Sequence, residues 1–186
     1  LVRLKDDGGT YALGFEVRRL SEGYVGDAWI DQIAAPAMRA HQRILAWPSD
    51  LATPDAGFMI VRESTHRMSL LSHHRATIGI RIPMLVSSVG RAWLAWCAHE
   101  EREATLALLA ERTDAIGAMA RDTAQVKQVL KDTRRRGYAV NRGEWATEGV
   151  VTAIGLPIRI GEHAIAAINL VMHRTAVSDR EIATRY

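Results

Sequence analysis

The chain has 186 residues, of which 48% are apolar and 24% are charged, and its formal net charge is +3. This composition is typical of an ordinary globular domain that can bury a core without disulfides or metals. The single cysteine, Cys97, excludes an intramolecular disulfide and a cysteine-rich metal site. No apolar run reaches the ~18 residues of a membrane span, and the N-terminus lacks an apolar signal region. We therefore expect a soluble, cytoplasmic protein without a membrane partner, and the weak charge gives no argument for nucleic-acid binding by this stretch itself.

The first predicted elements are a hairpin and two helices. In residues 1–13, Asp6-Asp7-Gly8-Gly9 separates two short β-prone runs, which predicts a β-hairpin. Residues 14–26 carry apolar side chains at helical spacing, which predicts a helix. A second helix is predicted over residues 27–45, capped by Asp27 and kinked or restarted at Pro36. Its expected apolar face contains Ile30, Ile33, Ala34, Ala37 and His41.

The central and last parts of the chain mix strands with helices. Short strands are predicted at residues 58–61, 68–71 and 78–82, and helices at residues 87–97, at 100–112 and from Asp122 to a stop at Gly137. Two long apolar runs, 150–160 and 163–172, predict a hairpin around Gly161-Glu162. The capping box Ser178-Asp-Arg-Glu181 predicts a last helix. This order predicts an α+β fold with an antiparallel sheet flanked by helices, and both ends are expected to continue into a longer protein.

Catalytic signatures do not stand out in the sequence. It contains no Gly-rich phosphate loop, dinucleotide fingerprint or nucleophile elbow. Three histidines, His66, His73 and His74, are candidate zinc ligands, but alternation along a strand would place His73 on the opposite face from the other two. We favour structural or pocket-lining histidines, and we expect no metal, no cofactor and no catalysis. The alternative is a metal-dependent enzyme that uses these three histidines.

The most informative segment is the one from Pro83 to Arg91. A strand ends at Pro83, and Ser87, Ser88 and Gly90 begin a helix, so several backbone N–H groups without intrahelical partners should point outward. Such a helix terminus binds anionic groups such as carboxylates. The alternative is that Ser87 only caps its own helix.

Two further residues could face a ligand. Asn169 lies within the apolar run 166–172, where its amide must either pair with neighbouring backbone or face a pocket. Trp145 lies in a polar loop and could form a flat apolar wall or a small satellite core. Elsewhere, a buried and inert thiol is expected at Cys97.

Several segments, in this order and spacing, resemble the isocitrate lyase regulator (IclR) family of bacterial transcription factors. They are Tyr11-Ala-Leu-Gly14, Ile82-Pro-Met84, Ser87-Ser-Val-Gly-Arg-Ala-Trp-Leu-Ala95, Arg136-Gly-Tyr138 and Ala166-Ala-Ile168. A closer resemblance is to the subgroup that activates breakdown of hydroxyphenylpropionate and related aromatic acids. It rests on Arg18-Arg-Leu-Ser-Glu-Gly23, Ala35-Pro36, Trp47-Pro-Ser-Asp50, Val61-Arg-Glu-Ser-Thr-His-Arg67, Ser72-His-His-Arg75 and Glu144-Trp145.

The resemblance implies a division of the chain. Residues 1–13 would be the remnant of the wing of a winged helix-turn-helix, 14–26 the linker helix, and 27–186 an effector-binding domain of GAF/PAS-like fold. The full protein would bind operator DNA through the missing N-terminal domain, as a dimer or a dimer of dimers. This piece would sense a small-molecule carboxylate and support assembly of a homo-oligomer. A ligand-free dimerisation module is a further alternative.

The resemblance also implies an effector site against the sheet. Its backbone donors would be Ser88 and Val89, and the remaining positions are Asn141, Ala153, Asn169 and Val171, with an apolar wall at Leu71, His74, Ile82 and Val151. Members that bind small keto acids have an acid, a cysteine and two serines where this chain has Asn141, Ala153, Asn169 and Val171. The pocket should therefore be less polar and suit a carboxylate on an aromatic or alkyl body. Because the following loop varies in length, Arg142 could replace Asn141.

Overall fold

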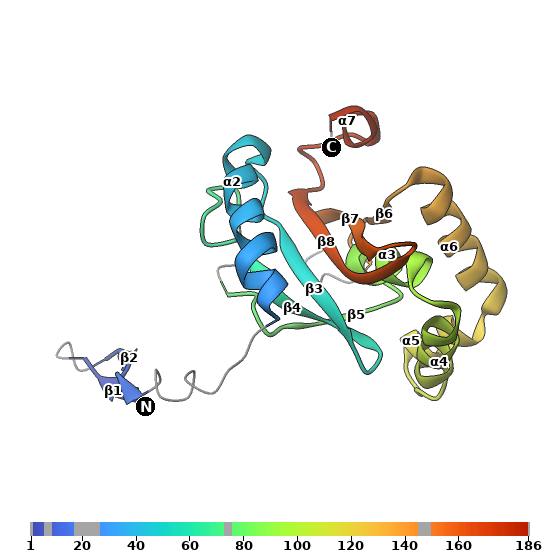
Figure 1. The fold of residues 1–186 in the computed structure, drawn as a ribbon, viewed down its shortest axis with the longest axis horizontal. Helices are drawn as coiled ribbons and strands as arrows, with labels where there is room; N and C mark the ends of the chain where they lie inside the picture. Colours follow the sequence, from blue (N-terminus) through green and yellow to red (C-terminus); the bar gives the residue numbers. More distant parts are fainter. Residues whose placement is uncertain (1, 6–8, 17–26, 73–75, 145–149, 186) are drawn as a thin grey trace. The chain divides into compact units, whose positions relative to one another are not determined.

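The computed structural model describes residues 2–5, 9–16, 27–72, 76–144 and 150–185, which divide into two units, Leu1–Ala34 and Ala35–Tyr186 (Figure 1). In the first unit, β1 (Val2–Leu4) and β2 (Tyr11–Leu13) form the predicted antiparallel pair, with Val2 opposite Leu13. The Lys5 N–H donates to Thr10 O across the connection. Residues 6–8, and all of the predicted helix beyond residue 16, lie outside the described residues.

The predicted helix at residues 27–45 contains a change of helix type. A π-helical turn, η1 (Ile30–Ala34), precedes α2 (Ala35–Leu45), so Pro36 falls in the first turn of α2, where a missing N–H costs least. The predicted apolar face is wrong beyond Ile30: Ile33 is 68% exposed, whereas Ala35, Met38 and Gln42 are buried. A π-helical turn contains more residues than an α-helical turn. The side chains that follow it therefore point in other directions than a continuous α-helix would give, and a different face of α2 is buried.

The second unit is built on a six-stranded antiparallel sheet with the order β5-β4-β3-β8-β7-β6 (Figure 1). Its strands are β3 (Asp50–Asp55), β4 (Phe58–Ser64), β5 (Arg81–Pro83), β6 (Ala139–Asn141), β7 (Val151–Ile160) and β8 (His163–His173). The strand at 58–61 and the long hairpin are confirmed, and Gly161 adopts the positive φ of 60° that its turn needs. The α+β prediction with an antiparallel sheet is therefore confirmed.

Two strand predictions need correction. Residues 68–71 form turns, in which Leu70 is 99% exposed, because Met68 and Ser69 donate their N–H groups to Thr65 O. The predicted strand at 78–82 begins only at Arg81, because a turn closed by Ile80 N–H and Thr77 O precedes it. Strands β3 and β6 were not predicted.

Five helices follow in the second unit: α3 (Ser88–Trp96), α4 (His99–Ala110), α5 (Ala115–Arg121), α6 (Thr123–Arg136) and α7 (Asp179–Arg185). The predicted caps form: Asp122 Oδ1 accepts from Gln125 N–H, Gly137 ends α6 with φ 85°, and Ser178 and Glu181 complete the capping box. Helix α5, capped by Asp114, was not predicted.

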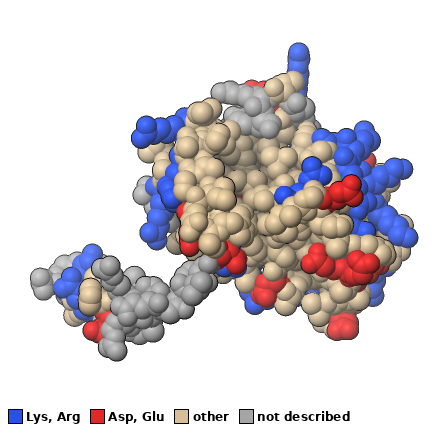
Figure 2. Space-filling model, viewed as in Figure 1, with Lys and Arg blue, Asp and Glu red and all other residues tan. Residues whose placement is uncertain are grey.

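Arginines at the end of α6 complement the negative end of its helix dipole. They are Arg134, Arg135 and Arg136, and Figure 2 shows Lys and Arg side chains gathered along the edge where α6 lies. None of the helices in the described ranges is long and apolar enough to cross a lipid bilayer.

Helix α3 packs on one face of the sheet and supplies much of the main core, which includes Ala52, Met59, Val89, Leu94 and Ala167. A smaller cluster of Val140, Ile154, Leu170, Met172 and Ile182 includes the side chains that alternate with these along β6, β7 and β8. The contact with α3 is closest at Gly155, where a Cβ atom would lie 2.4 Å from Ser88 O. Glycine is therefore needed at this point of β7, because it lets the start of α3 rest on the sheet.

Candidate functional site

The N-terminus of α3 keeps two buried donors. Ser87 is the N-cap, with φ −113° and ψ 155°, and its Oγ accepts from Gly90 N–H at 3.1 Å. The N–H groups of Ser88 and Val89 have no acceptor among the described residues, although these residues are only 2% and 0% exposed. Buried N–H groups without a partner are rare in proteins. Ser87 thus caps its own helix, and the N–H groups of Ser88 and Val89 remain. The two alternatives drawn from the sequence, a capped helix start and an anion-binding helix start, are therefore compatible.

The strand register brings most of the predicted site residues to the side of the sheet that α3 covers. Gly155, which touches α3, lies opposite Asn169, and Ala153 lies opposite both Val171 and Asn141. Side chains of directly opposed residues point to the same face, and so do residues two apart on one strand. Val151 therefore shares this face. Ile82 lies at the β5 side of the sheet, in the main core with Val89.

The remaining predicted site residues are not placed together with these. Leu71 lies in the turn after β4 and is 44% exposed, so its assignment to a pocket wall remains a prediction. His74 and Trp145 lie outside the described residues.

Asn141 ties β6 to the segment before α3. Its Nδ2 donates to Val86 O, and its Oδ1 accepts from Gly143 N–H at 2.9 Å. Asn141 is buried, whereas Arg142 is exposed. Of these two candidates, Asn141 lies on the face that α3 covers, and its amide is already engaged by the protein.

Asn169 pairs with Asp50 on the neighbouring strand. The Asp50 N–H donates to Asn169 Oδ1 at 2.7 Å, and Asn169 Nδ2 donates to Asp50 Oδ2 at 3.4 Å. These two bonds fix the orientation of the amide. They use one donor and one acceptor, so each end of the amide retains one further hydrogen-bonding site.

Asp50 is the centre of a buried polar cluster that the sequence did not reveal. Thr77 donates to Asp50 Oδ1 at 2.9 Å, and His66 Nε2 lies 3.3 Å from Asp50 Oδ2. Ser64 Oγ lies 2.7 Å from Thr77 Oγ1. Burial alone would raise the pKa of Asp50, but His66 and the hydroxyls of Ser64 and Thr77 hold it below the ordinary value.

His66 is a structural histidine in this cluster. Its Nδ1 lies 2.6 Å from Ser72 Oγ, and its Nε2 lies 3.3 Å from Asp50 Oδ2, so the ring bridges these two side chains. The predicted alternation of histidines along a strand is wrong, because residues 65–71 form turns. His73 and His74 lie outside the described residues, and the remainder holds no group of three potential metal ligands. Ser72, His66 and Asp50 are also the residue types of a nucleophilic triad, but here they join the turn after β4 to β3.

Arg91 is a second buried charged residue whose contacts sequence reasoning missed. This buried side chain on α3 donates to Leu85 O at 2.8 Å, to Val140 O at 2.6 Å and to Glu144 Oε1 at 2.9 Å. Burial raises the pKa of Glu144, but the Arg142 N–H and the Arg91 guanidinium outweigh it and lower the pKa. Arg91 thereby holds the end of β6 and the start of the next loop against α3.

Cys97, at the other end of α3, has the expected character. Burial raises the pKa of its thiol to about 11, so the thiol is neutral at physiological pH.

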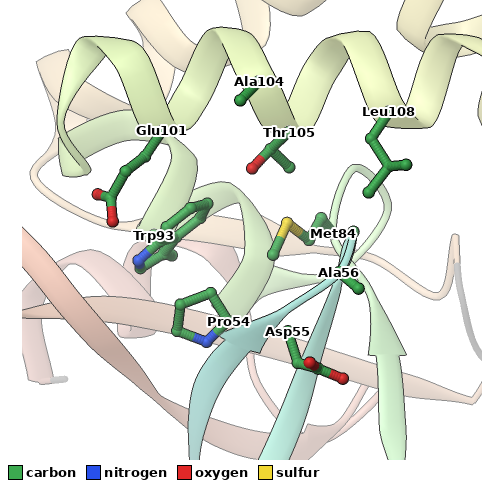
Figure 3. A pocket seen from close by; sticks show the side chains of 10 residues that line it. Pro54, Asp55, Ala56, Met84, Trp93, Glu101, Ala104, Thr105 and Leu108 are labelled. Atoms are coloured by element: carbon green, nitrogen blue, oxygen red, sulfur yellow. The ribbon is translucent and has the colours of Figure 1, made fainter.

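An open hollow of about 300 Å³ lies between α4 and the tip of the β3–β4 hairpin (Figure 3). Its lining includes Pro54, Met84, Trp93, Glu101 and Leu108. It contains none of the predicted site residues. The candidate site is therefore separate from it, at the Ser88 end of α3.

Comparison with known proteins identifies relatives of this arrangement. The family model described as "Bacterial transcriptional regulator IclR C-terminal" matches residues 23–186. The solved structure of the Thermotoga maritima IclR is similar, with a TM-score of 0.74 and 16% identity, over 97% of this chain and 72% of that chain. An IclR-family regulator from Brucella abortus has a TM-score of 0.72 and 22% identity, over 99% of this chain and 68% of that chain.

A third similar structure carries a ligand. It is an IclR homologue from Microbacterium hydrocarbonoxydans in complex with 4-hydroxybenzoate. The TM-score is 0.67 and the identity 26%, over 98% of this chain and 76% of that chain.

Proposed function

This chain belongs to the bacterial transcriptional regulator IclR C-terminal family, and from that premise we propose that residues 27–186 are the effector-sensing and assembly part of a DNA-binding regulator. Residues 1–13 would belong to the wing of its winged helix-turn-helix and 14–26 to the linker helix. The regulator would bind operator DNA through that N-terminal domain, as a dimer or a dimer of dimers in the cytoplasm. Its role is binding and switching without catalysis.

The observation that carries the proposed effector site is the pair of buried N–H groups at Ser88 and Val89, which have no acceptor among the described residues. A carboxylate would satisfy both donors and would lie at the positive end of the α3 dipole. The sheet residues that share this face, Val151, Ala153 and Val171, offer apolar contacts to the rest of the ligand. The amide of Asn141 is engaged by Val86 O and Gly143 N–H, and the amide of Asn169 is partly engaged by Asp50, which makes this wall less polar than the two side chains suggest.

We further propose that the effector is an aromatic carboxylate and that the regulator controls breakdown of aromatic compounds. The apolar residues on the sheet favour a ligand with an aromatic or alkyl body over a small keto acid. The homologue in complex with 4-hydroxybenzoate supports this class. Coupling of about 1–3 kcal/mol between effector and DNA binding would suffice for a switch.

Isothermal titration calorimetry with phenylpropionates, benzoates and small keto acids tests the ligand class. We expect at least one aromatic acid to bind more tightly than glyoxylate or pyruvate. If no aromatic acid binds while a keto acid does, the ligand class is wrong. If no carboxylate binds or raises the melting temperature, the alternative of a ligand-free dimerisation module gains support.

Asn169→Leu is expected to weaken binding of a hydroxylated aromatic acid more than binding of its deoxy analogue. The amide keeps one donor and one acceptor beyond its bonds to Asp50, and either can pair with a ligand hydroxyl. A lost neutral hydrogen bond costs about 1 kcal/mol, or roughly fivefold in affinity. The deoxy ligand, measured on the same variant, controls for structural damage. Equal losses for both ligands would show that Asn169 has no role in recognising the hydroxyl.

The metal-dependent enzyme based on His66, His73 and His74 is not favoured. Both ring nitrogens of His66 already face Ser72 and Asp50. Metal analysis of the purified protein decides the question, because a stoichiometric transition metal would revive this alternative.

A further inference from the structure

Asp50 lies beside the proposed effector site, on the same side of the sheet. Ala52 of β3 is opposite Ala167 of β8, so Asp50 and Asn169, each two residues along, share the face that α3 covers. Asn169 is in turn opposite Gly155, against which Ser88 packs. Asp50 and Gly155 are two strand spacings apart, roughly 10 Å. Asp50 is only 4% exposed.

The contacts around this carboxylate favour its ionised form. It accepts from Thr77 and from Asn169 Nδ2, and His66 faces its Oδ2 atom. His66 and the hydroxyls of Ser64 and Thr77 hold the pKa of Asp50 below its ordinary value in spite of burial. The hydroxyl and the amide are neutral, so they orient the negative charge without cancelling it. His66 Nε2 lies 3.3 Å from Asp50 Oδ2, and the imidazole adds a positive charge to this pair only when it is protonated.

We propose that the carboxylate of Asp50 is a specificity determinant that makes the effector site accept monocarboxylates and discriminate against dicarboxylates. This inference rests on the proposed function, because it takes the first effector carboxylate to bind Ser88 and Val89. The two N–H groups and the dipole of α3 compensate one negative charge. A second charge on the ligand would meet Asp50 across a buried region of low effective dielectric, where like charges repel strongly.

The test compares two ligands of nearly equal shape, 4-nitrobenzoate and terephthalate, which differ by one negative charge. Calorimetry at pH 7.5 on the wild-type protein is expected to show 4-nitrobenzoate binding at least about tenfold more tightly. Asp50→Asn removes the charge while keeping the shape of the side chain, so it should reduce this ratio by about fivefold or more. The reduction should come mainly from tighter terephthalate binding.

Thr77→Val is the matched control. It removes a hydrogen bond to Asp50 and leaves the charge in place, so the ratio of the two affinities should stay close to that of the wild type. A ratio that falls equally in Thr77→Val and Asp50→Asn would assign the effect to packing and would overturn the inference.

The wild-type measurement alone can also decide the question, whether or not Asp50→Asn folds. Binding of terephthalate as tight as that of 4-nitrobenzoate would overturn the role of Asp50 and leave the proposed function intact. Absence of binding by any monocarboxylate would instead refute the proposed function, and this inference with it.

Discussion

Ser88→Pro is expected to weaken effector binding strongly while leaving α3 in place. Ser88 is the first residue of α3, a position where proline is readily accepted, and Ser87 before it has the extended backbone that a following proline requires. The substitution therefore removes one N–H donor without breaking the helix. A hydrogen bond to a charged group contributes about 1.5–3 kcal/mol, which corresponds to a loss of roughly 10- to 150-fold in affinity. Calorimetry with the tightest-binding aromatic acid measures this loss, and circular dichroism checks the fold.

Ser88→Ala is the matched control for this experiment. It keeps the main-chain N–H and removes only the hydroxyl, so most of the affinity should remain. If alanine were as damaging as proline, the side chain rather than the backbone would bind the effector. The proposal of a main-chain anion site would then be wrong.

The start of α3 could be predicted because local residues determine it. Ser87 caps the helix through Gly90 N–H, as short-range capping rules require. The long hairpin of β7 and β8 follows from two apolar runs around Gly161, which has the positive φ that its turn requires. In both places the sequence signal and the structural contact lie within a few residues of each other.

The Asp50 cluster could not be predicted in the same way, because it depends on strand register. Asp50 meets Ser64 across the β3–β4 pair and Asn169 across 119 positions of sequence. Strand β3 was itself missed, since it contains Pro54 and two aspartates, which are uncommon in strands. Proline has no N–H to donate to a neighbouring strand. It is tolerated at position 54 because β3 pairs with β8 only at Leu51 and Ala52, so no partner on that side needs the missing donor.

The same limit explains the wrong strand prediction at residues 68–71. Alternating apolar side chains suggested a strand, but hydrogen bonds to Thr65 O and to Ser69 Oγ fold this segment into turns. The sequence allows Asn169 either a backbone partner or a ligand. The structure shows that it pairs with Asp50 and still retains hydrogen-bonding capacity on the α3 face. Pattern alone cannot distinguish these outcomes, because both place a polar residue in an apolar run.

Gly155→Ala is expected to destabilise the protein by about 3 kcal/mol, at the upper end of the usual cost of overpacking. An added Cβ would lie 2.4 Å from Ser88 O, 2.5 Å from Ser88 C and 3.0 Å from Val89 N. These are backbone atoms, so the start of α3 would have to move away from the sheet. Alanine in an unobstructed strand would instead be slightly stabilising relative to glycine. Urea denaturation gives the free energy of unfolding.

Gly9→Ala controls for the change of residue type, because nothing lies within 4 Å of an added Cβ at that position. It should leave the unfolding transition nearly unchanged. Because Gly155 touches the two residues whose N–H groups form the proposed anion site, Gly155→Ala should also weaken effector binding in protein that remains folded. A stable Gly155→Ala variant with full affinity would show that α3 need not rest on β7 at this point. The close approach of helix and sheet would then not be what positions the two donors.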